Sequence, residues 1–157
     1  MAIILGIDPG SIKTGFGVIE HTKGKSIYIS SGVIKLSGQD FALRLYEIFT
    51  SIQNLIDMYS PNEMAIEQIF MSKNAASALK LGHARGAAIV ACTSKNIAVN
   101  EYSSREIKQS VVGTGGAEKS QVQHMVKVLL GLTENPPEDA ADALGTAICH
   151  ANKTLGR

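Results

Sequence analysis

The sequence predicts an α/β fold in which a five-stranded mixed sheet is covered by helices on both faces. Two observations carry this prediction. Three strand-like segments come first, and the rest of the chain then alternates between strand and helix patterns. Consecutive strands favour an antiparallel meander, whereas strands joined by crossover helices favour parallel pairing. The 157 residues contain no repeat or linker, so we expect one domain over residues 1–157.

Five segments carry the strand patterns. Residues 2–8, "AIILGID", form a continuous apolar run, which is typical of a strand buried on both faces. Residues 14–21, "TGFGVIEH", and 26–36, "SIYISSGVIKL", alternate as the next two strands of a meander would. Two shorter strands are predicted at residues 63–68, "EMAIEQ", and 97–102, "IAVNEY".

Helical periodicity fills the segments between and after these strands. The first helix has apolar residues three and four apart, with Asp40 before it as a candidate N-cap. The last begins at "NPPEDAADALGTAICH", where Asn135 is the candidate N-cap and Pro136 the first helical residue. Glu138, three residues after Asn135, would complete a capping box with it. The predicted helices cover residues 41–59, 74–93, 104–112, 117–130 and 136–150.

Composition and charge exclude several classes of protein. Hydrophobic residues make up 45% and charged residues 18% of the chain, which indicates a globular protein rather than a disordered one. The net charge of +1 means that nucleic-acid binding would need a local basic surface. Cys92 and Cys149 lie in apolar helical patterns without metal-ligand spacing, so we expect core thiols in a reducing compartment. With no signal-peptide or membrane-span pattern, the expected location is the cytoplasm.

Two strands end in carboxylates. Asp8 follows a buried run and precedes a Pro-Gly turn, and Glu67 has a similar position at the end of "MAIE". Either residue alone is explained as an ordinary turn or strand-end residue. If the two strands are parallel neighbours, however, both carboxylates emerge at one edge of the sheet, about 5 Å apart. A divalent cation such as Mg²⁺ or Mn²⁺ would relieve their repulsion.

Two further carboxylates lie near the start of the last helix. Asp139 and Asp142 are three residues apart and therefore share a face. Acidic residues at a helix N-terminus also complement the helix dipole, and this explanation suffices for Glu138. Four carboxylates from two strand ends and one helix could hold two metal ions, the arrangement that hydrolyses phosphodiester bonds. The sequence thus predicts Asp8, Glu67, Asp139 and Asp142 as catalytic, metal-binding residues.

Four blocks of the chain resemble the RuvC family of bacterial Holliday-junction resolvases. They are "GIDPGS" with "TGFGVI", "AIEQIFMSKNAASALKLGHARGAAI", "REIKQSVVGTGGAEKSQVQHMV" and "EDAADALGTAI", in the order and at the spacing of that family. The resemblance covers nearly the whole chain. It implies a ribonuclease-H-like fold, and it assigns the metal ions to the same four carboxylates.

The resemblance also implies an activity and partners. Members of the family nick two symmetric strands of a four-way DNA junction during recombination and repair, with Mg²⁺ as the cofactor. Their products carry 5′-phosphate and 3′-hydroxyl ends. The family acts as a homodimer and works with the RuvA–RuvB branch-migration complex. These are expectations for the present chain.

Three residues are predicted to contact DNA. Phe70, in the segment after Glu67, would stack on an unpaired base near the crossover, although a loop residue closing over the core is the alternative. Lys108 and Lys119 flank "SVVGTGGAE" and match family positions credited with DNA contact, although most lysines are simply solvated. The same segment lacks the Gly directly before Lys119 that a nucleotide-binding P-loop requires.

The helix at residues 74–93 has a ridge of small residues, Ala78, Gly82 and Gly86, at intervals of four. Each interior glycine costs a helix about 1 kcal/mol relative to alanine, so close packing is expected in compensation. That packing is either against the symmetry mate in a dimer or against the chain's own sheet. The four histidines share no spacing, and no function is assigned to them.

Two other classes of protein stay open at this point. The stretch "GIDPGSIKTGFG" also fits an actin-like or sugar-kinase ATPase, but those proteins clasp the nucleotide between two such domains. Binding of ATP would distinguish that class. A non-catalytic junction-binding scaffold would be expected to lack at least one carboxylate, whereas this chain has all four.

Overall fold

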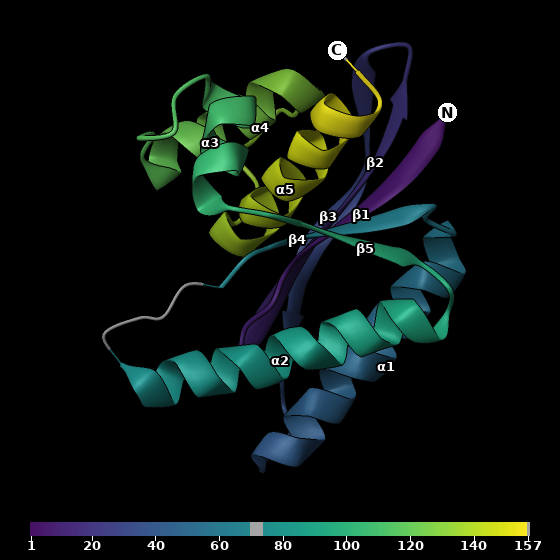
Figure 1. Ribbon diagram of the computed structural model, residues 1–157, viewed down its shortest axis with the longest axis vertical. Coiled ribbons are helices and arrows are strands. Elements are labelled where there is room, and N and C mark those ends of the chain that lie inside the picture. Colours follow the sequence, from purple (N-terminus) through teal and green to yellow (C-terminus); the bar gives the residue numbers. More distant parts are fainter. Residues whose placement is uncertain (70–73, 157) are drawn as a thin grey trace.

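The computed structural model describes residues 1–69 and 74–156. Five strands form one sheet in the order β3-β2-β1-β4-β5 (Figure 1). The strands are β1 (Ala2–Asp8), β2 (Lys13–Thr22), β3 (Lys25–Lys35), β4 (Glu63–Glu67) and β5 (Ala98–Tyr102). The helices are α1 (Phe41–Tyr59), α2 (Ala75–Ser94), α3 (Ser104–Val112), α4 (Lys119–Leu130) and α5 (Glu138–Thr154).

The sheet is mixed, as the sequence predicts. β1 pairs antiparallel with β2, and β2 pairs antiparallel with β3, whereas β4 pairs parallel with both β1 and β5. Ile7 of β1 lies opposite Ile66 of β4. Asp8 and Glu67, the next residue on each strand, therefore leave the sheet at the same edge, as expected from their positions after parallel strands.

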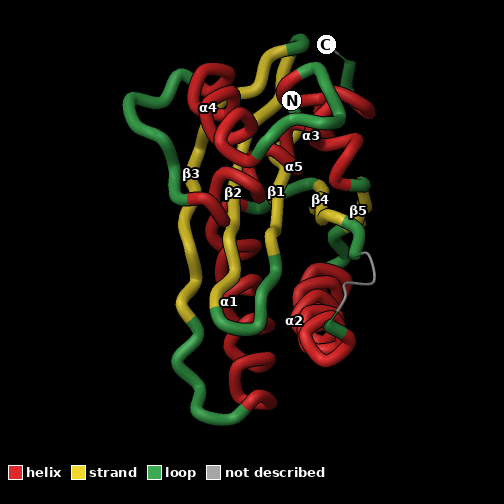
Figure 2. The backbone as a smooth tube through the Cα atoms, turned by 90° about the vertical axis from the view of Figure 1, so that its left-hand side faces the viewer, coloured by secondary structure: helices red, strands yellow, loops and turns green. Residues whose placement is uncertain are grey.

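Helices lie on both faces of the sheet (Figure 1 and Figure 2). On one face, Leu5 and Ile7 belong to a core that includes buried residues of α1 and α2. On the other face, Ile4 belongs to a second core with buried residues of α3, α4 and α5, among them Leu144. Because successive side chains of a strand point to opposite faces, β1 is buried on both sides and Asp8 points to the face of α5. None of the described helices is long and apolar enough to cross a membrane.

Glycines on β1 and β2 let α5 approach the sheet at backbone distance. A Cβ atom added to Gly6 would overlap the backbone oxygen of Ala143, and one added to Gly15 would overlap that of Asp139. A Cβ atom at Gly17 would meet the side chain of Leu144 at 2.6 Å. No side chain other than hydrogen fits between these strands and the helix, so the three glycines fix how closely α5 lies.

Most predicted boundaries agree with the structure to within two residues. The Asp40 side chain caps α1 by accepting a hydrogen bond from the Leu43 backbone N–H at 2.8 Å, which confirms the predicted N-cap. The predicted cap of the last helix is wrong. The N-cap residue of α5 is Pro137, not Asn135, and the helix runs on to Thr154. A residue before a proline avoids helical geometry, so Pro136 cannot begin a helix when Pro137 follows it.

Replacing Gly15 by alanine should destabilise the protein, because the new methyl group would push α5 away from β2. Overpacking of this kind costs about 1–3 kcal/mol. Urea unfolding measures the loss. Gly116→Ala is the matched control, because nothing lies within 4 Å of a Cβ atom at that position. An equal free energy of unfolding for the two variants would contradict the close approach.

Candidate active site

The ends of β1 and β4 and the start of α5 meet around a cavity of about 410 Å³. All four carboxylates predicted from the sequence line it: Asp8, Glu67, Asp139 and Asp142. The loop after β1, the first turn of α3 and the start of α4 complete the lining. Strand pairing and helix packing thus bring together four side chains that are up to 134 residues apart in the chain, from Asp8 to Asp142.

Three of the four carboxylates form a tight cluster. One oxygen from each of Asp8, Asp139 and Asp142 can be chosen so that all three lie within 4.8 Å of one another. Asp8 comes from the end of β1, and the other two come from adjacent turns on one face of α5. Carboxylate oxygens at this separation suit a hard divalent cation such as Mg²⁺.

Glu67 lies in the same cavity but is not part of that tight cluster. Its negative charge nevertheless contributes to raising the pKa of both Asp8 and Asp142. The backbone at this point is held by Arg85 of α2, whose Nε donates to the Glu67 carbonyl at 3.2 Å. The same guanidinium pairs with Glu101 of β5 at 2.7 Å. Arg85 therefore fixes the strand end that carries Glu67.

Two of the crowded carboxylates, Asp8 and Asp142, resist ionisation. Burial, and then the charges of Asp142 and Asp139, raise the pKa of Asp8 from 3.8 to about 8. Burial also raises the pKa of Asp142 from 3.8 to about 6, against the opposing effect of Lys119. A carboxyl group takes up a proton when its charge is neither solvated nor neutralised. The site thus has more negative charge than the surrounding protein compensates.

Lysines compensate part of this charge. Lys119 pairs with Glu138 at 2.8 Å and with Asp142 at 3.7 Å, and its pKa is raised chiefly by the hydrogen bond to Glu138. Lys13 pairs with Asp139 at 3.2 Å. Sequence reasoning missed Lys13, because no local pattern shows that the first residue of β2 faces a helix more than a hundred residues later.

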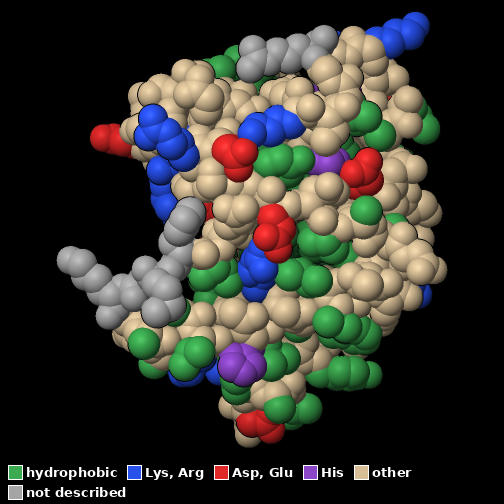
Figure 3. Space-filling view, viewed as in Figure 1, with side chains coloured by type: hydrophobic (Ala, Val, Ile, Leu, Met, Phe, Trp, Pro, Cys, Tyr) green, Lys and Arg blue, Asp and Glu red, His purple; other side chains and the backbone are tan. Residues whose placement is uncertain are grey.

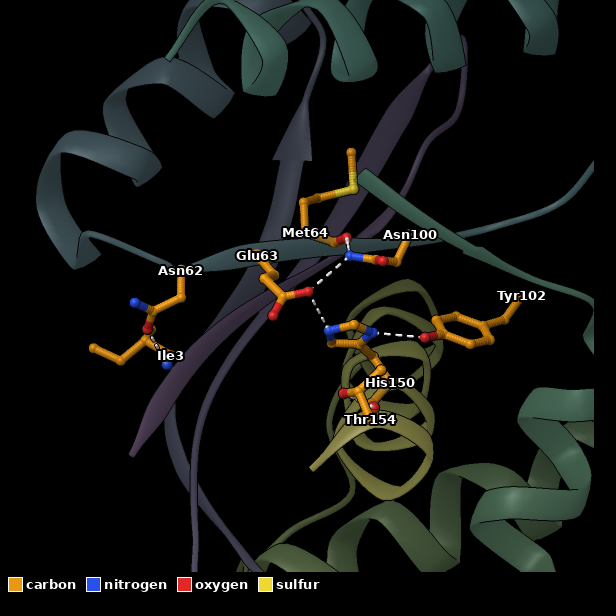
Figure 4. A network of polar contacts seen from close by, with 8 residues as sticks. All are labelled: Ile3, Asn62, Glu63, Met64, Asn100, Tyr102, His150 and Thr154. Atoms are coloured by element: carbon orange, nitrogen blue, oxygen red, sulfur yellow. Dashed lines mark hydrogen bonds and ion pairs between the residues drawn. The ribbon is translucent and has the colours of Figure 1, made fainter. Parts of the chain in front are cut away.

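A buried polar network joins the other ends of the elements that carry the site (Figure 4). His150 of α5 is fully buried, with its Nδ1 atom 2.6 Å from the Tyr102 hydroxyl and its Nε2 atom 2.9 Å from a Glu63 carboxylate oxygen. Asn100 of β5 donates to the same oxygen at 3.0 Å. Glu63 begins β4, the strand that ends in Glu67, so the network holds β4 and β5 against α5. Spacing alone gives no signal of this function for His150.

The predicted DNA-contacting residues fall into two groups. Lys108 and Lys119 both line the cavity with the carboxylates. Phe70 lies outside the described residues. In Figure 3, several Lys and Arg side chains lie on the upper left of the visible face. Whether the two lysines contact DNA stays a prediction.

A cavity lined by clustered carboxylates and bordered by lysines is typical of enzymes that use divalent cations, among them those that hydrolyse phosphodiester bonds. Comparison with known proteins narrows this class. Residues 4–150 match the family model described as crossover junction endodeoxyribonuclease RuvC. The chain belongs to the RuvC family.

Relatives in sequence and structure agree with this membership. The crossover junction endodeoxyribonuclease RuvC of Saccharophagus degradans is 58% identical over 153 residues, which are 97% of this chain and 88% of that protein. The structure titled Thermus thermophilus RuvC in complex with Holliday junction substrate superposes with a TM-score of 0.89 at 34% identity, over 96% of this chain and 93% of that one. The yeast mitochondrial Holliday junction resolvase shares only the fold, with a TM-score of 0.69 at 16% identity over 93% and 76%.

These matches confirm the predicted ribonuclease-H-like α/β fold and the resemblance to the resolvase family. The matched proteins are named as nucleases, and the matches extend over nearly the whole chain. Both the ATPase and the non-catalytic scaffold are therefore disfavoured as alternatives.

Asp8→Asn should stabilise the metal-free protein at alkaline pH. Because the folded-state pKa of Asp8 is raised to about 8, the native state binds more protons than the unfolded state between about pH 4 and pH 8. Stability therefore falls as the pH rises through this interval, and the asparagine variant lacks this loss. We expect a gain on the order of 2–4 kcal/mol at pH 8 in EDTA, and a smaller gain at pH 5.

Urea unfolding at both pH values measures this difference, and Glu134→Gln, a change at an exposed carboxylate, is the control. If wild type and Asp8→Asn lose stability equally between pH 5 and pH 8, the pKa of Asp8 is not raised in the folded protein.

Proposed function

We propose that this chain resolves Holliday junctions, by cutting two symmetric strands of a four-way DNA junction during recombination and repair. The products would carry 5′-phosphate and 3′-hydroxyl ends. The single observation that carries the proposal is the convergence of Asp8, Glu67, Asp139 and Asp142 in one cavity of a RuvC-family chain. The likeness to the Thermus thermophilus protein, whose structure contains a Holliday junction substrate, supports the choice of DNA.

The donor set fits divalent metal ions. Three carboxylates within 4.8 Å, with a fourth in the same cavity, supply only oxygen ligands. Burial and neighbouring carboxylates raise the pKa values of Asp8 and Asp142, and a cation would neutralise that crowded negative charge. We infer that Mg²⁺ is the cofactor, that Mn²⁺ can replace it and that each site holds two ions. Such ions activate a water molecule and stabilise the leaving oxygen of a phosphodiester.

The chain's own side chains then have separable functions. The four carboxylates hold the cations and are the catalytic residues of the proposal. Lys119, which already contacts the edge of the cluster through Asp142, would bind the DNA backbone beside the scissile phosphate. Lys108, which lines the same cavity, would do so from α3. For Phe70, stacking on an unpaired base rests on the family resemblance alone.

A homodimer would supply two active sites for two strands. The ridge of α2 supports this part of the proposal. A Cβ atom at Gly82 or Gly86 would meet nothing within 4 Å, so the chain's own sheet does not pack against these glycines. Val90 lies on the same ridge, four residues after Gly86, and is 57% exposed. Leu79, three residues before Gly82 and therefore next to it on the helix surface, is 67% exposed. A second copy of α2 would cover this apolar surface.

Two further expectations rest on family membership. The RuvA–RuvB branch-migration complex would deliver the junction, and the protein would act in the cytoplasm. Cys92 and Cys149 are both free and buried, which is compatible with a reducing compartment.

Asp8→Asn should abolish cleavage of a synthetic four-way junction while junction binding persists, because the amide weakens cation binding but leaves the lysines in place. We expect a loss of about a thousand-fold or more in the rate of cutting. Denaturing gels with Mg²⁺ or EDTA measure cutting of the junction and of a matched linear duplex. Sedimentation of the uncut complex should give two chains per junction.

Asp57→Asn is the control, because Asp57 does not line the cavity and its carboxylate forms an exposed ion pair with Lys95. An Asp8→Asn protein that cuts at the wild-type rate would refute the site. Wild-type protein that binds the junction but never cuts it with Mg²⁺ would refute the activity.

A further inference from the structure

Two lysines lie opposite each other at one end of the β2–β3 pair. Lys13 begins β2, Lys35 ends β3, and the register places them directly across from one another. Both side chains are exposed. Like charges directly opposite on one face of a sheet are destabilising. The fold thus places two lysines side by side, and only Lys13 has a carboxylate partner, Asp139, among the described residues. An anionic ligand would relieve the repulsion between them.

The backbone around these lysines is well fixed. The hydroxyl of the fully buried Thr14 accepts a hydrogen bond from the Gly10 N–H at 3.3 Å and donates to the Gly10 carbonyl at 3.4 Å. Beyond Lys35, the Leu36 N–H donates to the Ile12 carbonyl at 3.1 Å, which continues the pairing past the strand ends. Both lysines therefore project from hydrogen-bonded strands rather than from a loop.

The pair lies on the same face as the carboxylate cluster. Gly15, two residues after Lys13, packs against Asp139, and residues two apart on a strand share a face. The Lys13 ammonium group itself is 3.2 Å from an Asp139 oxygen. Lys35, directly opposite, faces the same side but forms no ion pair with any residue in the described parts of the chain. A strip of positive charge thus extends from the cluster across β2 to the edge strand β3.

We propose that Lys13 and Lys35 form a phosphate-binding strip that holds the DNA backbone next to the carboxylate site. This inference rests on the proposed function, and it adds two residues to the predicted contacts of Lys108 and Lys119. Lys35 is free to contact a phosphate directly. Lys13 shares Asp139 with the metal site, so its ammonium group becomes available to DNA when a cation takes up the charge of that carboxylate.

Salt dependence of junction binding tests the strip. Fluorescence anisotropy of a labelled four-way junction, in EDTA to prevent cutting, gives the affinity of the full chain over about 50–200 mM salt. Each lost phosphate contact lowers the slope of log affinity against log salt by about 0.9. Lys35→Met should lower it by about that amount and weaken binding several-fold. Lys13→Met/Lys35→Met should match Lys35→Met in EDTA and should lower the slope further when Ca²⁺ replaces EDTA, because Lys13 is paired with Asp139 in the absence of a cation.

Lys25→Met is the matched control, because Lys25 is an exposed lysine at the opposite end of the same strand. It should leave the slope unchanged. Thermal unfolding separates binding from structure: removing one of two opposed charges should keep or raise the melting temperature. A melting temperature that falls in Lys35→Met would mean that the lysine serves the fold, and it would overturn the proposal.

Unchanged slopes in both lysine variants would also overturn the proposal. The cutting assay keeps this outcome distinct from failure of the proposed function. If wild type cuts the junction with Mg²⁺ and the variants bind with its slope, only the strip is wrong. If wild type neither binds nor cuts, the proposed function fails first.

Discussion

The whole site depends on the close approach of α5 to the sheet. Asp139 and Asp142 can join Asp8 only if the helix lies directly on β1 and β2. Glycines at positions 6, 15 and 17 permit this approach, because any larger side chain there would overlap α5. A helix packed through ordinary side chains lies several ångströms farther away, because helix and sheet layers are usually separated by those side chains. The geometry of the carboxylate site is therefore set by the absence of side chains on these glycines as much as by the carboxylates.

This geometry opposes the stability of the protein. Bringing carboxylates together in a half-buried cavity raises the pKa of Asp8 and Asp142, and each pKa unit corresponds to about 1.4 kcal/mol. The packed cores on both faces of the sheet offset this cost, as does the buried network around His150. A cation that binds between the carboxylates would relieve their repulsion, and this relief would favour binding. The protein alone neutralises this cluster only partly, which fits the metal ions proposed for it.

Much of this could be predicted from one sequence, since the signals are local. The apolar run before Asp8, the parallel strand before Glu67 and the spacing of Asp139 and Asp142 each follow from backbone periodicity. The resemblance to the resolvase family then indicated that these four carboxylates form one site. The start of α5 was mispredicted because Pro137 excludes Pro136 from the helix, an effect that outweighs the capping preference of Asn135.

What the sequence could not predict depends on contacts between distant segments. Lys13 reaches Asp139, and His150 reaches Glu63, across 126 and 87 residues of chain respectively. The sequence also left two partners open for the glycine ridge of α2. The structure excludes packing of the chain's own sheet against Gly82 and Gly86.

Metal binding by Gly15→Ala tests most directly whether the approach of α5 builds the site. Free Mn²⁺, counted by electron paramagnetic resonance during a titration without DNA, gives the affinity of wild type, Gly15→Ala and Gly116→Ala. Gly15→Ala, shown by circular dichroism to be folded, should bind Mn²⁺ at least about tenfold more weakly, whereas Gly116→Ala should match wild type. A folded Gly15→Ala protein with wild-type Mn²⁺ affinity would contradict the account.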